Sequence, residues 1–77
     1  MNMETTLARA MDGRLKIVRI NGGRNLVRKL YSMGIYEGVV IEKILSYSKG
    51  PVIVKVHNSQ VAIGRGMAEK LSVEKID

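Results

Sequence analysis

Few residues in this sequence could carry out catalysis. It contains one histidine, His57, and no cysteine. A hydrolytic Ser–His–Asp set could be assembled only from Ser59, His57 and Asp12, and no Gly-x-Ser-x-Gly turn supports it. Nucleophilic and metal sites generally need a Cys–His pair or several metal-binding side chains. The sequence therefore predicts a protein that is not an enzyme, with no catalytic residues, no cofactor and no metal site of its own.

Two further features resemble parts of ligand sites. Gly22 and Gly23 precede an expected helix, and Arg24 at the start of that helix could hold an anion. The segment lacks the P-loop Lys-Ser/Thr and the dinucleotide-binding glycine spacing, so a flexible turn is favoured. His57 lies near an expected strand end without a second imidazole, which favours a rim histidine with no ligand role.

Positive charge is the property that points to a partner. The formal net charge is +6. Six basic residues and no acid lie between positions 14 and 29: Arg14, Lys16, Arg19, Arg24, Arg28 and Lys29. Such a field favours nucleic acid, an anionic membrane surface or an acidic protein face, and charge alone does not choose among them.

Helical spacing predicts a candidate contact surface. Arg24, Arg28 and Tyr31 lie at positions i, i+4 and i+7, which is one side of the expected helix. Exposed arginine and tyrosine side chains can pair and stack with a partner. Ile35 and Tyr36 follow in the glycine-bounded turn at the helix end. We predict that these five residues bind a partner; the alternative for the stripe of Arg24, Arg28 and Tyr31 is a solvated face with a snorkelling tyrosine. Any apolar docking notch is expected between the Tyr36 turn and the neighbouring strand ends.

Apolar periodicity predicts the helix that presents this surface. Leu26, Leu30 and Met33 fall on its opposite side, together with Val27, so a helix is expected over residues 24–33. Asn21 or Asn25 is the expected N-cap residue. Gly34 is expected in the left-handed conformation at the C-terminal end, with Ile35 folding back on the last turn.

Runs of β-branched residues predict five strands around this helix. The strands are expected over residues 14–20, 39–47, 52–57, 60–65 and 71–76. Asn58–Ser59 is the expected turn between the third and fourth strands, and residues 66–70 form a short helical turn before the last. Adjacent Ile17 and Val18 break the alternation, which indicates a bulge or a strand covered on both faces. Short strands with tight turns favour an all-β small barrel, because closure removes most edges.

The length of 77 residues suits one domain. We expect residues 1–77 to form a single domain with residues 1–6 loosely ordered, and Leu7 and Met11 to form one helical turn that covers the barrel bottom. No apolar run approaches the roughly 18 residues of a membrane span, and no signal-peptide region is evident. Together with the absence of cysteine, this favours a cytoplasmic location.

Several short motifs, in this order, resemble those of one known family. The segment 28–42, RKLYSMGIYEGVVIE, resembles the helix, Leu-Gly-Leu/Ile, x-x-Gly and strand core of FeoA domains, the small accessory proteins of bacterial ferrous iron transport. Gly13 with the strand at 16–20, Gly50–Pro51 with the strand after it, and the closing segment 61–71 resemble further parts of the family. The likeness covers roughly residues 7 to 76.

This resemblance implies an SH3-like barrel with a helix after its first strand, located in the cytoplasm. It also implies a non-enzymatic module that regulates iron uptake by docking on the cytosolic part of the FeoB membrane transporter, with membrane contact only through that partner. The alternative is a nucleic-acid-binding basic barrel. It is less favoured because the strands between Val39 and Ile63 carry no aromatic residue except Tyr47. A metal sensor or carrier would need ligands shared across a homo-oligomer, which the sequence leaves open.

Overall fold

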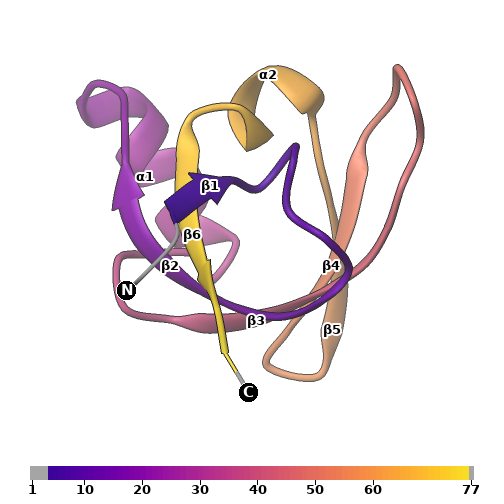
Figure 1. The fold of residues 1–77 in the computed structure, drawn as a ribbon. Coiled ribbons are helices and arrows are strands. Elements are labelled where there is room, and N and C mark those ends of the chain that lie inside the picture. The colour runs from indigo at the N-terminus through magenta and orange to yellow at the C-terminus, as the bar shows by residue number, and fades with distance from the viewer. Residues whose placement is uncertain (1–3, 77) are drawn as a thin grey trace.

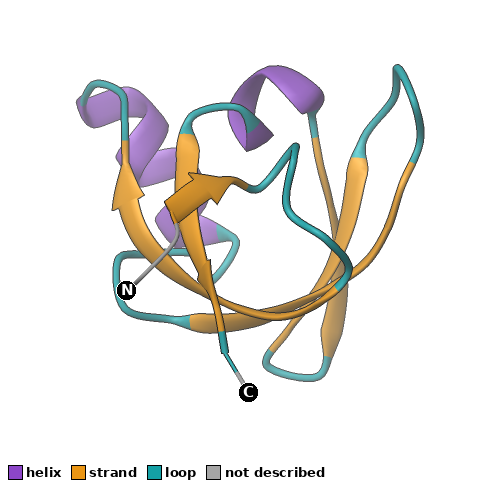
Figure 2. Ribbon diagram, viewed as in Figure 1, coloured by secondary structure: helices purple, strands orange, loops and turns teal. Residues whose placement is uncertain are grey.

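The computed structural model describes residues 4–76 as a small barrel of curled antiparallel strands. Helix α1 lies on its left side and the short helix α2 at its top in Figures 1 and 2. The elements are β1 (Glu4–Thr6), β2 (Gly13–Ile20), α1 (Arg24–Ser32), β3 (Val40–Ser46), β4 (Val52–Val56), β5 (Ser59–Ile63), α2 (Arg65–Ala68) and β6 (Leu71–Lys75). The predicted all-β class is confirmed. The structure has six strands rather than about five, and the helix follows the second strand, because β1 precedes the first predicted strand.

The six strands pair in the order β1-β6-β2-β3-β4-β5. The register shifts between Ile17 and Arg19 on β2, and again between Lys43 and Leu45 on β3. The shift at Val18 is the bulge that the sequence allowed. Bulges increase local twist and bend a strand, so these two shifts help the sheet to curl into a barrel. The two ends of the sheet are β1 and β5.

Alternating residues of the strands fill the barrel interior. On β4, Val52, Val54 and Val56 are buried while Lys55 is exposed, as the period-2 pattern requires. The remaining buried apolar residues are Leu7, Ala10, Leu15, Ile17, Leu30, Ile35, Val39, Ile41, Ile63, Ala68, Leu71 and Val73. Helix α1 contributes only one of these, Leu30, so most of its surface is free for other uses.

The N-terminal segment is more ordered than the sequence predicted. Residues 4–6 form β1, which pairs antiparallel with β6, and the loosely ordered prediction for them is wrong. Positions 1–3 lie outside the described residues. A helical turn does follow, because the Ala10 N–H donates to the Thr6 carbonyl at 2.8 Å. Leu7 is buried there, but Met11 is 78% exposed and does not cover the barrel.

Three predicted boundaries were wrong by small shifts. The β4–β5 turn is His57–Asn58, with φ values of 49° and 69°, rather than Asn58–Ser59. Helix α2 begins at Arg65 rather than at Gly66. Gly23 is the N-cap of α1 and makes no side-chain cap bond. Asn21 instead donates its side-chain amide to the Ser72 hydroxyl at 2.9 Å. Among residues 4–76 no helix is long and apolar enough to span a membrane.

Candidate docking surface

Helix α1 presents an exposed basic face. Arg24, Arg28 and Lys29 are exposed, and Tyr31 is 68% exposed. No residue of the helix is acidic. Within residues 4–76 the one ion pair joins Arg19 to Glu4 at 2.6 Å, so none of the helix cations is neutralised there. The predicted exposure of Arg24, Arg28 and Tyr31 is therefore confirmed.

The C-terminal end of α1 positions the next part of this surface. Gly34 has a φ of +85°, as predicted. Its N–H donates to the Tyr31 carbonyl at 2.9 Å, and the Ile35 N–H donates to the Leu30 carbonyl at 2.9 Å. This pair of bonds is the Schellman motif, which brings Ile35 back onto the helix. Ile35 has 0% exposure, so it is a core residue and its assignment as a direct contact is corrected.

Tyr36 directly follows the buried Ile35. Its ring centroid lies 5.8 Å from that of Tyr31, with the ring planes tilted by 53°. Tyr36 is 39% exposed. The loop is fixed behind it, because the Gly38 N–H donates to the Ile17 carbonyl at 2.7 Å. The structure thus brings two exposed tyrosines, one from the helix and one from the loop, into one aromatic pair.

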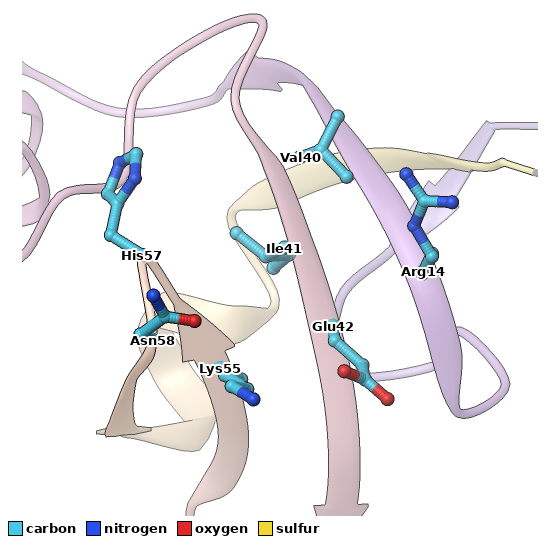
Figure 3. Close-up of a pocket in the computed structure, with 7 residues that line it drawn as sticks. All are labelled: Arg14, Val40, Ile41, Glu42, Lys55, His57 and Asn58. Atoms are coloured by element: carbon cyan, nitrogen blue, oxygen red, sulfur yellow. The ribbon is translucent and has the colours of Figure 1, made fainter.

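A groove of about 240 Å³ adjoins this loop across the outer face of β2, β3 and β4 (Figure 3). Its lining residues are Arg14, Val40, Ile41, Glu42, Lys55, His57 and Asn58. Glu42 pairs in register with Arg14 on one side and with Lys55 on the other. Five of the seven lining residues are polar, so the predicted apolar notch is instead a charged groove beside the Tyr36 loop.

His57 links the groove to the end of α1. A Cβ atom at Gly34 would lie 3.3 Å from Cδ2 of His57 and 3.2 Å from Cγ1 of Val56. The imidazole therefore packs against the glycine, and an added side chain would require Val56 and His57 to shift by a few tenths of an ångström. A second, more apolar hollow of about 310 Å³ lies elsewhere, at the barrel end near β1. It is lined by Glu4, Thr5, Ala10, Met11, Leu15 and Lys75.

Sequence reasoning missed the buried Lys43. Its ammonium donates to the carbonyls of Leu7 at 2.8 Å, Ala10 at 2.6 Å and Ala8 at 3.4 Å. Burial lowers the pKa of Lys43, an effect that Asp12 opposes and Arg65 reinforces. The signal was present in the sequence, because Lys43 lies two residues after the inward-facing Ile41 and therefore on the same side of β3.

No group of three His, Cys, Asp or Glu side chains that could hold a metal occurs between residues 4 and 76. The surface offers a charged groove together with guanidinium groups and phenol rings, and arginine and tyrosine are enriched at protein interfaces.

The model of the FeoA domain family matches residues 5–75. The chain belongs to the FeoA family. A protein of Methanocaldococcus jannaschii, provisionally named Fe(2+) transport protein A, is 42% identical over 69 residues, which cover 88% of this chain and 83% of that protein. FeoA proteins are accessory proteins of ferrous iron transport, and this chain is a member of that class.

Solved structures agree with this assignment. The crystal structure of an iron uptake regulatory protein, FeoA, superimposes with a TM-score of 0.85 at 36% identity, covering 96% of this chain and 99% of that one. The SH3-like barrel is thereby confirmed. The apo form of the manganese-activated repressor ScaR superimposes with a TM-score of 0.88 at 22% identity. It shows a shared fold, since 94% of this chain corresponds to 35% of the repressor.

Proposed function

We propose that this FeoA protein is a cytoplasmic, non-enzymatic module that regulates ferrous iron uptake by docking on the cytosolic part of a FeoB-type transporter. The observation that carries the proposal is the acid-free face of α1, joined to the Tyr31–Tyr36 pair. Arginine and tyrosine are among the residues that dominate binding energy at protein interfaces. The expected partner surface is acidic at its rim and apolar where it meets the two rings.

The geometry suits docking for a second reason. The Tyr36 loop is held by backbone bonds to β2, and the Schellman motif fixes the end of α1. The backbone that carries both tyrosines is therefore fixed before a partner arrives. A preorganised contact surface reduces the entropy lost on binding, so a modest number of contacts can give useful affinity.

The test is titration calorimetry of this protein with the purified cytosolic domain of the FeoB-type transporter from the same source. We expect saturable binding that weakens roughly tenfold for Tyr31→Ala and for Arg28→Ala, the loss typical of an interface anchor. Tyr47→Ala is the matched control, because Tyr47 is 57% exposed but follows the far end of β3. Equal losses for all three variants, or no binding, would refute the proposed surface.

Nucleic acid is the alternative partner for a basic barrel. The salt dependence of the affinity distinguishes it from a protein partner. Nucleic-acid affinity falls steeply with salt because phosphate contacts release counterions. The three tyrosines, at positions 31, 36 and 47, all lie outside the strands. A sheet that binds single strands usually presents aromatic rings for base stacking. This distribution favours a protein partner, and binding to a single-stranded oligonucleotide with a steep salt dependence would reverse the preference.

A further inference from the structure

The two ends of the sheet differ in how well they are protected. At one end, β1 has three residues and carries Glu4, which pairs with Arg19. At the other end, β5 has five residues, Ser-Gln-Val-Ala-Ile, with no charge and no proline. Its register with β4 is regular over all five pairs. Natural edge strands usually carry charges, prolines or bulges that prevent pairing with another chain, and β5 has none of these.

The turn before β5 determines which backbone groups are free. His57 and Asn58 both have positive φ, as in the two-residue type I′ turn of a hairpin. The pair that flanks such a turn, Val56 and Ser59, is hydrogen-bonded, and bonded and non-bonded pairs then alternate along the ladder. Gln60 and Ala62 are therefore in non-bonded pairs with β4, and their N–H and C=O groups point away from the sheet.

These outward groups have no other partner in the described part of the chain. Apart from the ladder to β4, no backbone hydrogen bond between residues 4 and 76 reaches Gln60 or Ala62. Both residues are exposed. On the outer face, Ala62 is aligned in register with Ile53 and Leu45, whereas Gln60 is opposite Lys55. The edge thus offers two donors, two acceptors and an adjoining apolar row.

We propose that β5 pairs antiparallel with β5 of a second copy of this protein, around a two-fold axis at Val61. In that register Gln60 lies opposite Ala62 of the other copy, and the outward groups of both residues exchange four hydrogen bonds. A long side chain then faces a small one on the outer face. No like charges stand opposite each other, although each copy carries a net charge of +6.

The composition of β5 favours a second copy of this protein over a peptide strand that would be selected by its charge. The strand itself is neutral, so it offers no charged group with which to select an acidic or basic peptide. Its own sequence supplies the complement in the two-fold register. This pairing uses the opposite end of the sheet from β1 and does not include α1, so it is independent of the docking proposed above.

Sedimentation velocity on the full chain tests the proposal. We expect a species of twice the 8.5 kDa chain mass to appear as concentration rises toward about 1 mM. Because two copies of net charge +6 repel each other, the dimer should be stronger at about 0.5 M than at 0.1 M salt. A monomer throughout this range at both salt concentrations would overturn the proposal.

The decisive variant is Ala62→Pro. It removes an N–H that points outward and leaves the β4 ladder intact, a position at which edge strands tolerate proline. We expect dimerisation to weaken roughly tenfold or more, since two of four intermolecular bonds are lost. Ala62→Ser keeps the N–H and is the matched control, expected to dimerise like the parent. An Ala62→Pro protein that dimerises as well as the parent would contradict the assigned register.

A charge-swapped pair covers the case in which the proline variant does not fold. The Gln60→Asp/Ala62→Asp protein opposes acids to acids across the two-fold axis, and Gln60→Lys/Ala62→Lys opposes bases to bases. Each should be monomeric alone, and an equimolar mixture should form a one-to-one heterodimer. Failure of the mixture to associate, or self-association of either variant at the parent's strength, would refute the β5 pairing.

Discussion

Two groups of basic side chains in this barrel are held in different ways. Lys43 and Arg65 donate to main-chain carbonyls, Lys43 in the turn after β1 and Arg65 in the loop between β3 and β4. Arg24 and Arg28 on α1 are exposed and are not in an ion pair with any residue between 4 and 76. The first group therefore ties two loops to the barrel through side-chain hydrogen bonds.

This difference separates basic side chains that stabilise the fold from basic side chains that are free to contact a partner. A buried carbonyl that loses its donor is costly, so we expect Lys43 to contribute to the stability of the barrel. An exposed guanidinium contributes little to stability. If the helix cations have a role, it is therefore in binding. Each of the following substitutions tests this division, beginning with the largest expected effect.

Lys43→Met should cause the largest loss. The variant fills similar space but leaves the carbonyls of Leu7 and Ala10 without their donor, which should lower the free energy of unfolding by about 3 kcal/mol. Urea denaturation followed by circular dichroism measures this. Lys55→Met is the matched control on β4, where the side chain is exposed, and should change stability by less than about 0.5 kcal/mol. Equal effects would mean that burial does not distinguish the two lysines.

The pH dependence of stability gives a second test of Lys43. Because its folded-state pKa is below the ordinary value of 10.5, the unfolded chain holds a proton that the folded chain has lost in the window between the two. The free energy of unfolding contributed by Lys43 should therefore rise as pH rises through that window. The stability difference between the parent and Lys43→Met should widen with pH, and a constant difference would contradict the lowered pKa.

Gly34→Val should have the next largest effect, because the exposed surface depends on the conformation of this residue. A β-branched side chain is strained at a φ of +85° and would press on Val56 and His57. We expect a loss of about 2 kcal/mol, and in any case more than 1 kcal/mol, in thermal unfolding. Gly66→Ala is the control, since Gly66 does not have a positive φ and no atom lies within 4 Å of the added carbon. An unchanged melting temperature for Gly34→Val would show that the helix cap is not required.

Arg65→Met should have a smaller effect than Lys43→Met. Its guanidinium donates to the Gly50 carbonyl at 3.1 Å, to the Ser46 hydroxyl at 2.6 Å and to the Tyr47 carbonyl. Because this site is partly exposed, water can replace the lost donor, and the expected loss is about 1 kcal/mol. Hydrogen exchange should speed up in the loop between β3 and β4 while the β2 amides stay protected. Uniform acceleration would show that Arg65 acts on the whole barrel.

Local patterns were enough to predict α1, the long strands and the Gly34 cap. The helix stripe and the alternation of β4 are short-range signals that a sequence carries directly. Strand β1 was missed because three residues, Glu-Thr-Thr, have no periodicity, and they form a strand only because β6 offers an edge. Ile35 was assigned to the surface from its place after Gly34, but the Schellman motif turns it into the core.

The Tyr31–Tyr36 pair shows the same limit for the site. Each tyrosine was identified from the sequence, but their ring contact depends on the left-handed turn that brings the loop beside the helix. Lys43, unlike the two tyrosines, was not identified from the sequence. Its burial was not predicted, because its charge argued against burial although its period-2 position was consistent with it. Only the three carbonyls of the turn after β1, contributed by residues more than 30 positions away, make that burial possible.

The smallest effect on stability is expected for Arg24→Ala/Arg28→Ala. Neither guanidinium is buried or ion-paired in the described chain, and alanine favours helix at least as well as arginine. The free energy of unfolding should change by less than about 0.5 kcal/mol, while affinity for the transporter's cytosolic domain falls and loses part of its salt dependence. A loss of stability comparable to that of Arg65→Met would make these arginines structural. In that case the helix arginines would stabilise the fold as Lys43 and Arg65 do, and they could not be assigned to partner binding on the ground that the fold does not need them.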